Sequence, residues 1–223
     1  YNYATQQRTA PGSTFKMVSA TAGLAEHVIS TTEQIQDLGV YKNVSNEPRC
    51  WIYRSFHGSH GLINVSEALR DSCNYFFYTI GHDLGIDTLG EYAHALGLGV
   101  STGIELVETT GNMSNAANHM DYAGSEWRIG DTLQAAIGQS DSVFTPLQLA
   151  EYCAAVANNG ERHSASILKS IRNYDYSEKV YERQDEVLST VESPQYNWDA
   201  IHEGMKEVIN SPLNETNYLN FYD

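Results

Sequence analysis

The sequence predicts a globular domain that is mostly helical and has few strands. Hydrophobic residues make up 41% of the 223 residues and aromatic residues 11%, which is enough to form a substantial core. Several segments carry the capping, proline and glycine signals that mark helix ends. Only residues 165–183 combine β-favouring residues with a central turn, around Asn173-Tyr174-Asp175, and they predict a hairpin.

The helices are expected in the following order. Pro11-Gly12 is a turn signal, and a helix is predicted to follow it from Ser13 to about Ala25. Residues 31–62 are predicted to form loops and short extended pieces. The remaining expected helices are one from Ser66 that breaks near Ser72-Cys73-Asn74, one over Tyr75–Leu84 that ends at Gly85, one from Asp87 to about Leu96, one capped by Thr145 and running to Val156, and one from Asn197 to Ile209.

Charge and composition exclude several classes of protein. The formal net charge is −15 and the basic residues are scattered, which argues against a nucleic-acid partner or an anionic membrane surface. No run of about 18 apolar residues is present, so no membrane-spanning helix is expected. The three cysteines form neither a disulfide framework nor a CxxC metal pattern.

A candidate nucleophile and base lie at the start of the first predicted helix. Ser13 precedes Lys16 by three positions, which places both side chains on one helix face. A lysine that is partly desolvated beside a serine oxygen can be neutral and act as a base. The alternative is a capping serine beside a solvated lysine. Ser166 and Lys169 repeat the spacing, but in a predicted strand they point to opposite faces, so we interpret that pair as structural.

A second candidate segment is Ser72-Cys73-Asn74, at a predicted helix break. Ser72 and Asn74 could point the same way while Cys73 packs inward. A Ser–Lys pair needs a hydroxyl to relay a proton and an amide to orient the lysine. Ordinary helix capping is the alternative interpretation of this triplet.

Together these segments resemble the penicillin-binding proteins, the D,D-transpeptidases that cross-link peptidoglycan. The resemblance covers about residues 8–210 and is closest to class B members of cell elongation. The motifs that carry it are Pro11-Gly12-Ser13-Thr14-Phe15-Lys16, Ser72-Cys73-Asn74 with Tyr75-Phe76-Phe77-Tyr78, Cys50-Trp51, Gly58-Ser59-His60-Gly61-Leu62, Trp127-Arg128-Ile129-Gly130-Asp131-Thr132, Ala136-Ile137-Gly138-Gln139 and Thr145-Pro146-Leu147-Gln148-Leu149-Ala150.

The resemblance implies a role for each candidate residue. Ser13 would attack the D-Ala-D-Ala carbonyl to form an acyl-enzyme, and Lys16 would take the Ser13 proton. Ser72 would pass a proton to the leaving group, while Asn74 would hold Lys16 and the substrate amide. The backbone N–H of Ser13 would supply half of the oxyanion hole.

The chain also departs from the family pattern. The Lys-Thr-Gly or Lys-Ser-Gly strand motif is absent, and the chain stops just short of where it is expected, after Asn214–Asp223. Gln139-Ser140 replaces the usual Gln-Gly. We therefore interpret residues 1–223 as a partial transpeptidase domain in an α+β serine D,D-transpeptidase (β-lactamase-like) fold, holding mostly the helical lobe and an incomplete antiparallel sheet. Uncovered sheet edges predict self-association.

The function that the resemblance implies is peptidoglycan D,D-transpeptidation, with acylation by β-lactams. This fragment by itself is expected to be inactive if catalysis needs the missing strand. The implied partners are peptidoglycan stem peptides, β-lactam antibiotics and other cell-wall synthesis proteins, and the implied location is the extracytoplasmic face of a bacterial membrane. The alternatives are a β-lactam sensor or scaffold that does not turn over, and a class D-like β-lactamase. No cofactor is expected, because Cys50, His57 and His60 lack a fourth zinc ligand.

Overall fold

The computed structural model of the chain describes residues 1–212. The N-terminal half holds α1 (Tyr3–Gln6), a 3-10 turn (Gly12–Phe15), α2 (Lys16–Ala25), β1 (Ile35–Asp37), α3 (Trp51–Phe56), β2 (Gly61–Ile63), α4 (Val65–Arg70) and α5 (Asn74–Ala95). The C-terminal half holds α6 (Ala116–Ala123), α7 (Ile129–Ala136), α8 (Pro146–Ala157), β3 (Glu161–His163), β4 (Ser170–Arg172), β5 (Lys179–Glu182), β6 (Val187–Thr190) and α9 (Gln195–Asn210).

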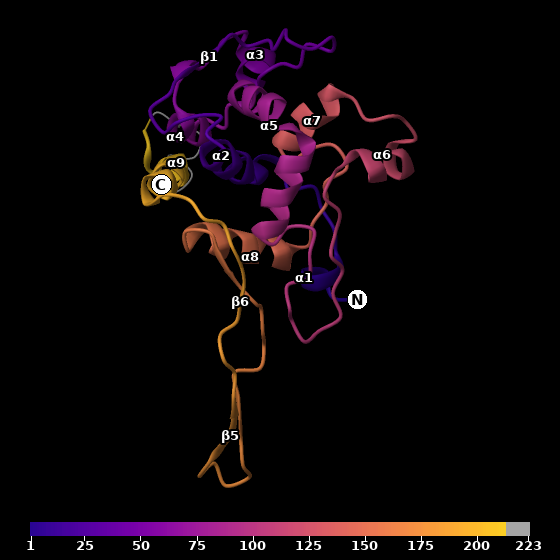
Figure 1. Cartoon of the computed structure of the whole chain (residues 1–223), viewed down its shortest axis with the longest axis vertical. Helices are drawn as coiled ribbons and strands as arrows, with labels where there is room; N and C mark the ends of the chain where they lie inside the picture. The colour runs from indigo at the N-terminus through magenta and orange to yellow at the C-terminus, as the bar shows by residue number, and fades with distance from the viewer. Residues whose placement is uncertain (213–223) are drawn as a thin grey trace.

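Helices form the body of the molecule, and α2 lies at its centre beside α4, α5 and α9 (Figure 1). The buried faces of these helices share one hydrophobic core, which includes Phe15, Leu24, Phe77, Leu133 and Trp198. Helices α5 and α7 approach closely at Gly81, where an added Cβ would lie 2.4 Å from the Cβ of Ala136. Helices α2 and α5 also approach closely, because a Cβ added at Gly23 of α2 would lie 2.9 Å from Ile80 Cγ2 of α5, and this contact helps to fix the two helices relative to each other.

The strands make three two-stranded antiparallel sheets within residues 1–212. Strand β1 pairs with β2, β3 with β6, and β4 with β5. The β4–β5 hairpin extends away from the body of the molecule (Figure 1). A helix-rich α+β fold with little of the sheet is therefore confirmed, and so is the predicted hairpin, whose turn contains Asn173-Tyr174-Asp175.

The helix-end signals located most of the long helices. Thr145 accepts a hydrogen bond from the Gln148 N–H in a capping box that starts α8, as expected. Gly85 has φ of 77° and interrupts α5 at the predicted position. The sequence did not predict α1, α3, α6 or α7, and α3 lies inside a segment expected to be loop and extended chain.

None of the helices in the part of the chain that the structure describes is long and apolar enough to cross a membrane. The segment Asn214–Asp223, after which the family's strand motif is expected, lies outside the described residues.

Candidate active site

The four residues singled out from the sequence meet at one point, around the amine of Lys16. Lys16 Nζ lies 3.2 Å from Ser13 Oγ, 2.8 Å from Ser72 Oγ and 2.6 Å from Asn74 Oδ1. The amine also donates to the backbone carbonyl of Ser72 at 2.8 Å. The Ser72 hydroxyl donates to Ser13 Oγ at 3.0 Å, so the two hydroxyls and the amine form a continuous network.

Burial sets the electrostatics of this network. The Lys16 side chain is 1% exposed, and its amine lies 5.8 Å from the centre of the Phe77 ring. Burial lowers the pKa of Lys16 from 10.5 to about 8, and the Cys73 and Cys50 sulfurs partly oppose the shift. About a tenth of Lys16 is therefore neutral at pH 7 and able to accept a proton.

A close backbone contact holds Ser13 in place. Ser13 lies in the 3-10 turn that leads into α2, and the Gly12 N–H before it donates to Gly138 O at 2.9 Å. Gly138 has φ of 74°, and a Cβ there would lie 2.0 Å from Gly12 O. Only glycine fits at this position, which explains why Ala136-Ile137-Gly138-Gln139 belongs to the site although it carries no reactive group.

Ser72 has a strained backbone at the junction of α4 and α5. Its φ of 50° lies in the left-handed region, which costs a non-glycine residue about 1 kcal/mol or more. This turn aims both the carbonyl and the hydroxyl of Ser72 at Lys16. Asn74 then begins α5, so the helix break predicted from the sequence is the feature that positions both side chains.

An apolar cavity of about 580 Å³ opens beside Ser13 and Ser72. Its other lining residues come from the 3-10 turn, α2, α3, α4, α9 and the segment before Ser72: Thr14, Met17, Trp51, Leu69, Arg70, Asp71, Met205, Val208 and Ile209. The Trp51 indole donates to Asp71 O at 3.0 Å and so fixes one wall next to Ser72. The nucleophile candidate therefore faces a space large enough for a small ligand.

A second group of reactive side chains lies directly behind Ser72 and Asn74. The ligand atoms of Asp37, Cys50, His60 and Cys73 all lie within 4.8 Å of one another. His60 Nδ1 is 2.8 Å from Asp37 Oδ2 and 3.7 Å from Cys50 Sγ. His57 is not in this group; it ends α3 and packs edge-on against Tyr53 at 5.5 Å.

The electrostatics of this group differ among its members: the ionised forms of Asp37 and Cys50 are favoured, whereas His60 and Cys73 hold their protons. A metal ion would have to displace those two protons. Burial raises the pKa of Asp37, but hydrogen bonds from His60 and Gly39 outweigh it and leave the value below its usual range. Burial disfavours charged His60, yet the contact with Asp37 raises its pKa to about 9. A hydrogen bond from Cys73 lowers the pKa of Cys50, and burial raises that of Cys73.

These four side chains could hold a metal ion. Zinc prefers cysteine sulfur, histidine nitrogen and carboxylate oxygen in four-coordinate tetrahedral sites, which is this donor set. His60 Nε2 is buried and has no hydrogen-bond partner within the described residues. The sequence analysis found Cys50 and His60 but missed Asp37 and Cys73, because they are distant in sequence and no spacing rule connects them.

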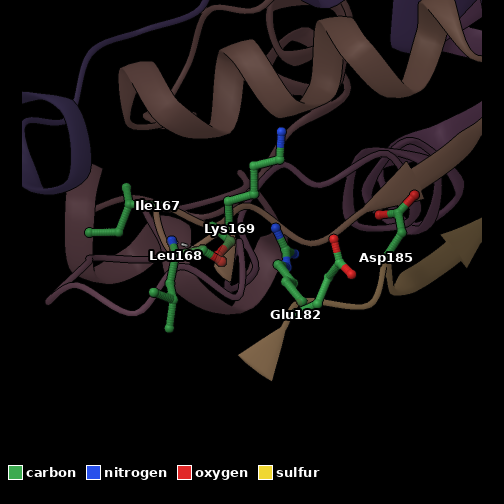
Figure 2. Close-up of a pocket in the computed structure, with 7 residues that line it drawn as sticks. Ile167, Leu168, Lys169, Glu182 and Asp185 are labelled. Carbon is green, nitrogen blue, oxygen red and sulfur yellow. Dashed lines mark hydrogen bonds between the residues drawn. The ribbon is translucent and has the colours of Figure 1, made fainter. Parts of the chain in front are cut away.

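The Ser166–Lys169 pair lies elsewhere, at the base of the hairpin. Both residues line a cavity of about 260 Å³ together with Glu182 and Asp185 (Figure 2). The Ser166 hydroxyl donates to Glu105, and the Lys169 amine points away from the labelled carboxylates (Figure 2). The repeated spacing therefore does not build a second serine–lysine site here.

Fold and site together define a domain in which a serine, a buried lysine and a Ser-x-Asn turn converge beside a cavity. The family model of the penicillin binding protein transpeptidase domain matches residues 1–219, and the chain belongs to this family.

Individual relatives agree with this assignment. The peptidoglycan D,D-transpeptidase MrdA of Haemophilus influenzae is 30% identical over 217 residues, which cover 95% of this chain and 32% of the relative. The structure of Pseudomonas aeruginosa PBP2 in complex with WCK 5153 has a TM-score of 0.83 and 26% identity, and the match covers all of this chain and 49% of that one. The Helicobacter pylori PBP2–MreC complex gives a TM-score of 0.78 at 26% identity, over 95% of this chain and 37% of that one. The chain spans about a quarter to a third of the length of the curated relatives it matches.

Proposed function

We propose that this chain is the part of a peptidoglycan D,D-transpeptidase that forms the acyl-enzyme, with Ser13 as the nucleophile. The observation that carries the proposal is the position of the buried Lys16 amine, in contact with Ser13, Ser72 and Asn74 at once. A serine beside a desolvated lysine can be deprotonated as it attacks a carbonyl carbon. The product is an acyl-enzyme on Ser13, formed as the leaving amine departs.

The hydrogen-bond inventory of Lys16 explains how it would act as the base. A neutral amine has two N–H groups and one lone pair. The Ser72 carbonyl and Asn74 Oδ1 accept only, so they take the two N–H groups at 2.8 and 2.6 Å. The lone pair is then left for the Ser13 hydroxyl, directly at 3.2 Å or through Ser72.

The same network provides a route for the proton to the leaving group. The Ser72 hydroxyl contacts both Lys16 Nζ and Ser13 Oγ, so it can move a proton from the lysine to an amine leaving Ser13. Asn74 holds Lys16, and its amide N–H₂ remains available for a substrate carbonyl. The backbone N–H of Ser13 supplies one oxyanion donor, a group typically worth about 3 kcal/mol in such sites.

The substrate we propose is a stem peptide ending in D-Ala-D-Ala, and β-lactams are proposed to acylate the same serine. Support comes from relatives named as peptidoglycan D,D-transpeptidases and from the match to the family model of the penicillin binding protein transpeptidase domain. The PBP2–MreC complex supports other cell-wall synthesis proteins as partners. We place the domain on the extracytoplasmic face of a bacterial membrane, where this substrate is found.

Labelling with a fluorescent penicillin tests the proposal. Ser13→Ala should abolish labelling, and Lys16→Ala and Asn74→Ala should each slow it by at least about a hundredfold. Ser166→Ala is the matched control, because it removes the serine of the other Ser-x-x-Lys pair and should leave labelling unchanged. Labelling that persists in Ser13→Ala would reject Ser13 as the nucleophile.

Release of the label over time and a separate stem-peptide cross-linking assay distinguish the two alternatives. A class D-like β-lactamase would release hydrolysed antibiotic in many turnovers, whereas a transpeptidase retains the label. A sensor or scaffold would label but would not join stem peptides. The contact between Asn74 and Lys16 favours the transpeptidase, because it completes the Ser-x-Asn arrangement that acyl transfer uses.

A further inference from the structure

The turn that carries Ser13 is contacted by a tyrosine from the middle of α8. The hydroxyl of Tyr152 donates to the backbone carbonyl of Thr14 at 2.9 Å, and the Tyr152 side chain is fully buried. Burial raises the pKa of Tyr152 well above its usual range, so the hydroxyl keeps its proton and acts as a donor. Thr14 directly follows Ser13, so this contact lies next to the candidate nucleophile.

The Thr14 carbonyl lies just outside the α-helical hydrogen bonds of α2. Helix α2 begins at Lys16 with Phe15 as its N-cap, and the N-cap carbonyl is the first that accepts a bond within an α-helix. If the α-helix began one residue earlier, the Val18 N–H would bond to Thr14 O. The Val18 N–H instead acts on the Tyr152 hydroxyl, where it partly opposes the effect of burial on the pKa of Tyr152. The hydroxyl therefore stands between the carbonyl and the N–H that would otherwise pair.

The inserted hydroxyl explains why the segment before α2 is a 3-10 turn rather than a further α-helical turn. Residues i and i+3 are eclipsed in a 3-10 helix, whereas in an α-helix they are offset by about 60°. Ser13 and Lys16 have this spacing, and the Lys16 N–H donates to Ser13 O in the 3-10 pattern. The turn therefore brings Ser13 Oγ toward Lys16, to 3.2 Å from Lys16 Nζ.

Two other contacts hold the ends of this turn. The Gly12 N–H donates to Gly138 O at 2.9 Å, and the Phe15 ring stacks on the Phe144 ring with 6.4 Å between ring centres. Neither contact involves the two backbone groups that the Tyr152 hydroxyl separates. The pairing of those two groups decides between a 3-10 and an α-helical start of α2, so the choice between the two forms depends on Tyr152.

We propose that Tyr152 is a positioning residue for the acylation of Ser13, an inference that rests on the function proposed above. Its hydroxyl holds the start of α2 in the form in which Ser13 contacts Lys16, and it touches neither the substrate nor the reacting atoms. Without the hydroxyl, the Val18 N–H can bond to Thr14 O, and α2 lengthens toward Ser13. Ser13 then rotates away from Lys16, and proton transfer between the two side chains slows.

The test compares two variants that each remove one buried tyrosine hydroxyl and keep the ring. Tyr152→Phe is the test variant, and Tyr41→Phe is the matched control, because Tyr41 is equally buried and its hydroxyl lies 2.9 Å from His82 Nδ1 of α5. Penicillin acylation is measured at several penicillin concentrations on a longer chain that continues beyond Asp223. In Tyr152→Phe the maximal acylation rate should fall at least about tenfold, while the penicillin concentration that gives half of that rate stays within about twofold. Tyr41→Phe should keep both values, whereas a general loss of stability would affect the two variants alike.

Crystal structures of the two variants provide a measurement that does not depend on acylation. Tyr152→Phe should show residues 12–15 in α-helical form, with Ser13 Oγ beyond hydrogen-bond distance of Lys16 Nζ, and Tyr41→Phe should show the turn unchanged. The proposal would be overturned by a wild-type acylation rate in Tyr152→Phe, by equal slowing in Tyr41→Phe, or by an unchanged 3-10 turn in Tyr152→Phe. If the wild-type longer chain is not acylated, the proposed function fails instead, and the crystal structures still decide the role of Tyr152.

Discussion

The buried amine of Lys16 predicts a specific dependence of stability on pH. Its pKa is about 8 in the folded chain, against 10.5 for a free lysine. Between these values the unfolded chain binds more protons than the folded chain, so the free energy of unfolding rises with pH. The cost of burying the ammonium is fully present below pH 8 and disappears by about pH 10.5.

The size of the effect follows from the shift. The difference between the pKa of Lys16 in the folded chain and in the unfolded chain corresponds to about 3 kcal/mol in the free energy of unfolding. Lys16→Met removes the titrating group while keeping a long side chain in the core. The stability of this variant relative to the wild type should therefore fall by about 3 kcal/mol between pH 7 and pH 10.5.

Urea unfolding followed by tryptophan fluorescence at several pH values measures this difference. Buried tyrosines also titrate at high pH, but they do so in both proteins and cancel in the comparison. The acceptors that Lys16→Met leaves unpaired, the Ser72 carbonyl and Asn74 Oδ1, add an offset that does not change with pH. A stability difference that stays constant across the range would refute a depressed Lys16 pKa, and with it the role of Lys16 as base.

Four further outcomes are expected. The rate of penicillin acylation should rise about tenfold per pH unit up to about pH 8 and then level off, because only neutral Lys16 accepts a proton; a rate independent of pH from 6 to 8 would contradict this. Gly138→Ala should cost about 3 kcal/mol of stability and displace Gly12. Gly124→Ala is the control, because Gly124 also has a positive φ but has open space around it, and it should cost about 1 kcal/mol. Equal losses in the two variants would argue against the close contact between Gly138 and Gly12. Elemental analysis should find one zinc ion per chain, lost in His60→Ala, and zinc retained by that variant would exclude the site. Light scattering should show a molar mass that grows with concentration as sheet edges associate, and a constant monomer mass would exclude self-association.

Local rules place the catalytic candidates at helix ends, and the resemblance to the penicillin-binding proteins singles them out as catalytic, because the spacing alone also fits helix capping. Ser13 and Lys16 are three residues apart at a helix start, and Ser72 and Asn74 flank a helix break. The structure adds what no local rule contains: α2 and the start of α5 meet so that one amine contacts three side chains. That meeting depends on core packing between distant segments, including Gly23 of α2 against Ile80 of α5.

The features that the sequence did not reveal depend on long-range contacts. Helix α3 has only six residues, which is too short for the apolar periodicity by which helices are recognised. Asp37 joins Cys50, His60 and Cys73 only because β1 pairs with β2 and brings the Asp37 carboxylate onto the His60 ring. The departure at Ser140 has a structural meaning as well: its φ is 65°, a conformation that glycine adopts without strain.

Intact mass after incubation with penicillin is the most direct test of the central claim, that Ser13 forms the acyl-enzyme. The measurement is made on this chain, on Ser13→Ala, and on a longer chain that continues beyond Asp223. One covalent adduct that maps to Ser13 and disappears in Ser13→Ala is the predicted result. An adduct on the longer chain alone would mean that later residues complete the site. An adduct that survives in Ser13→Ala, or the absence of any adduct on all forms, would contradict the account.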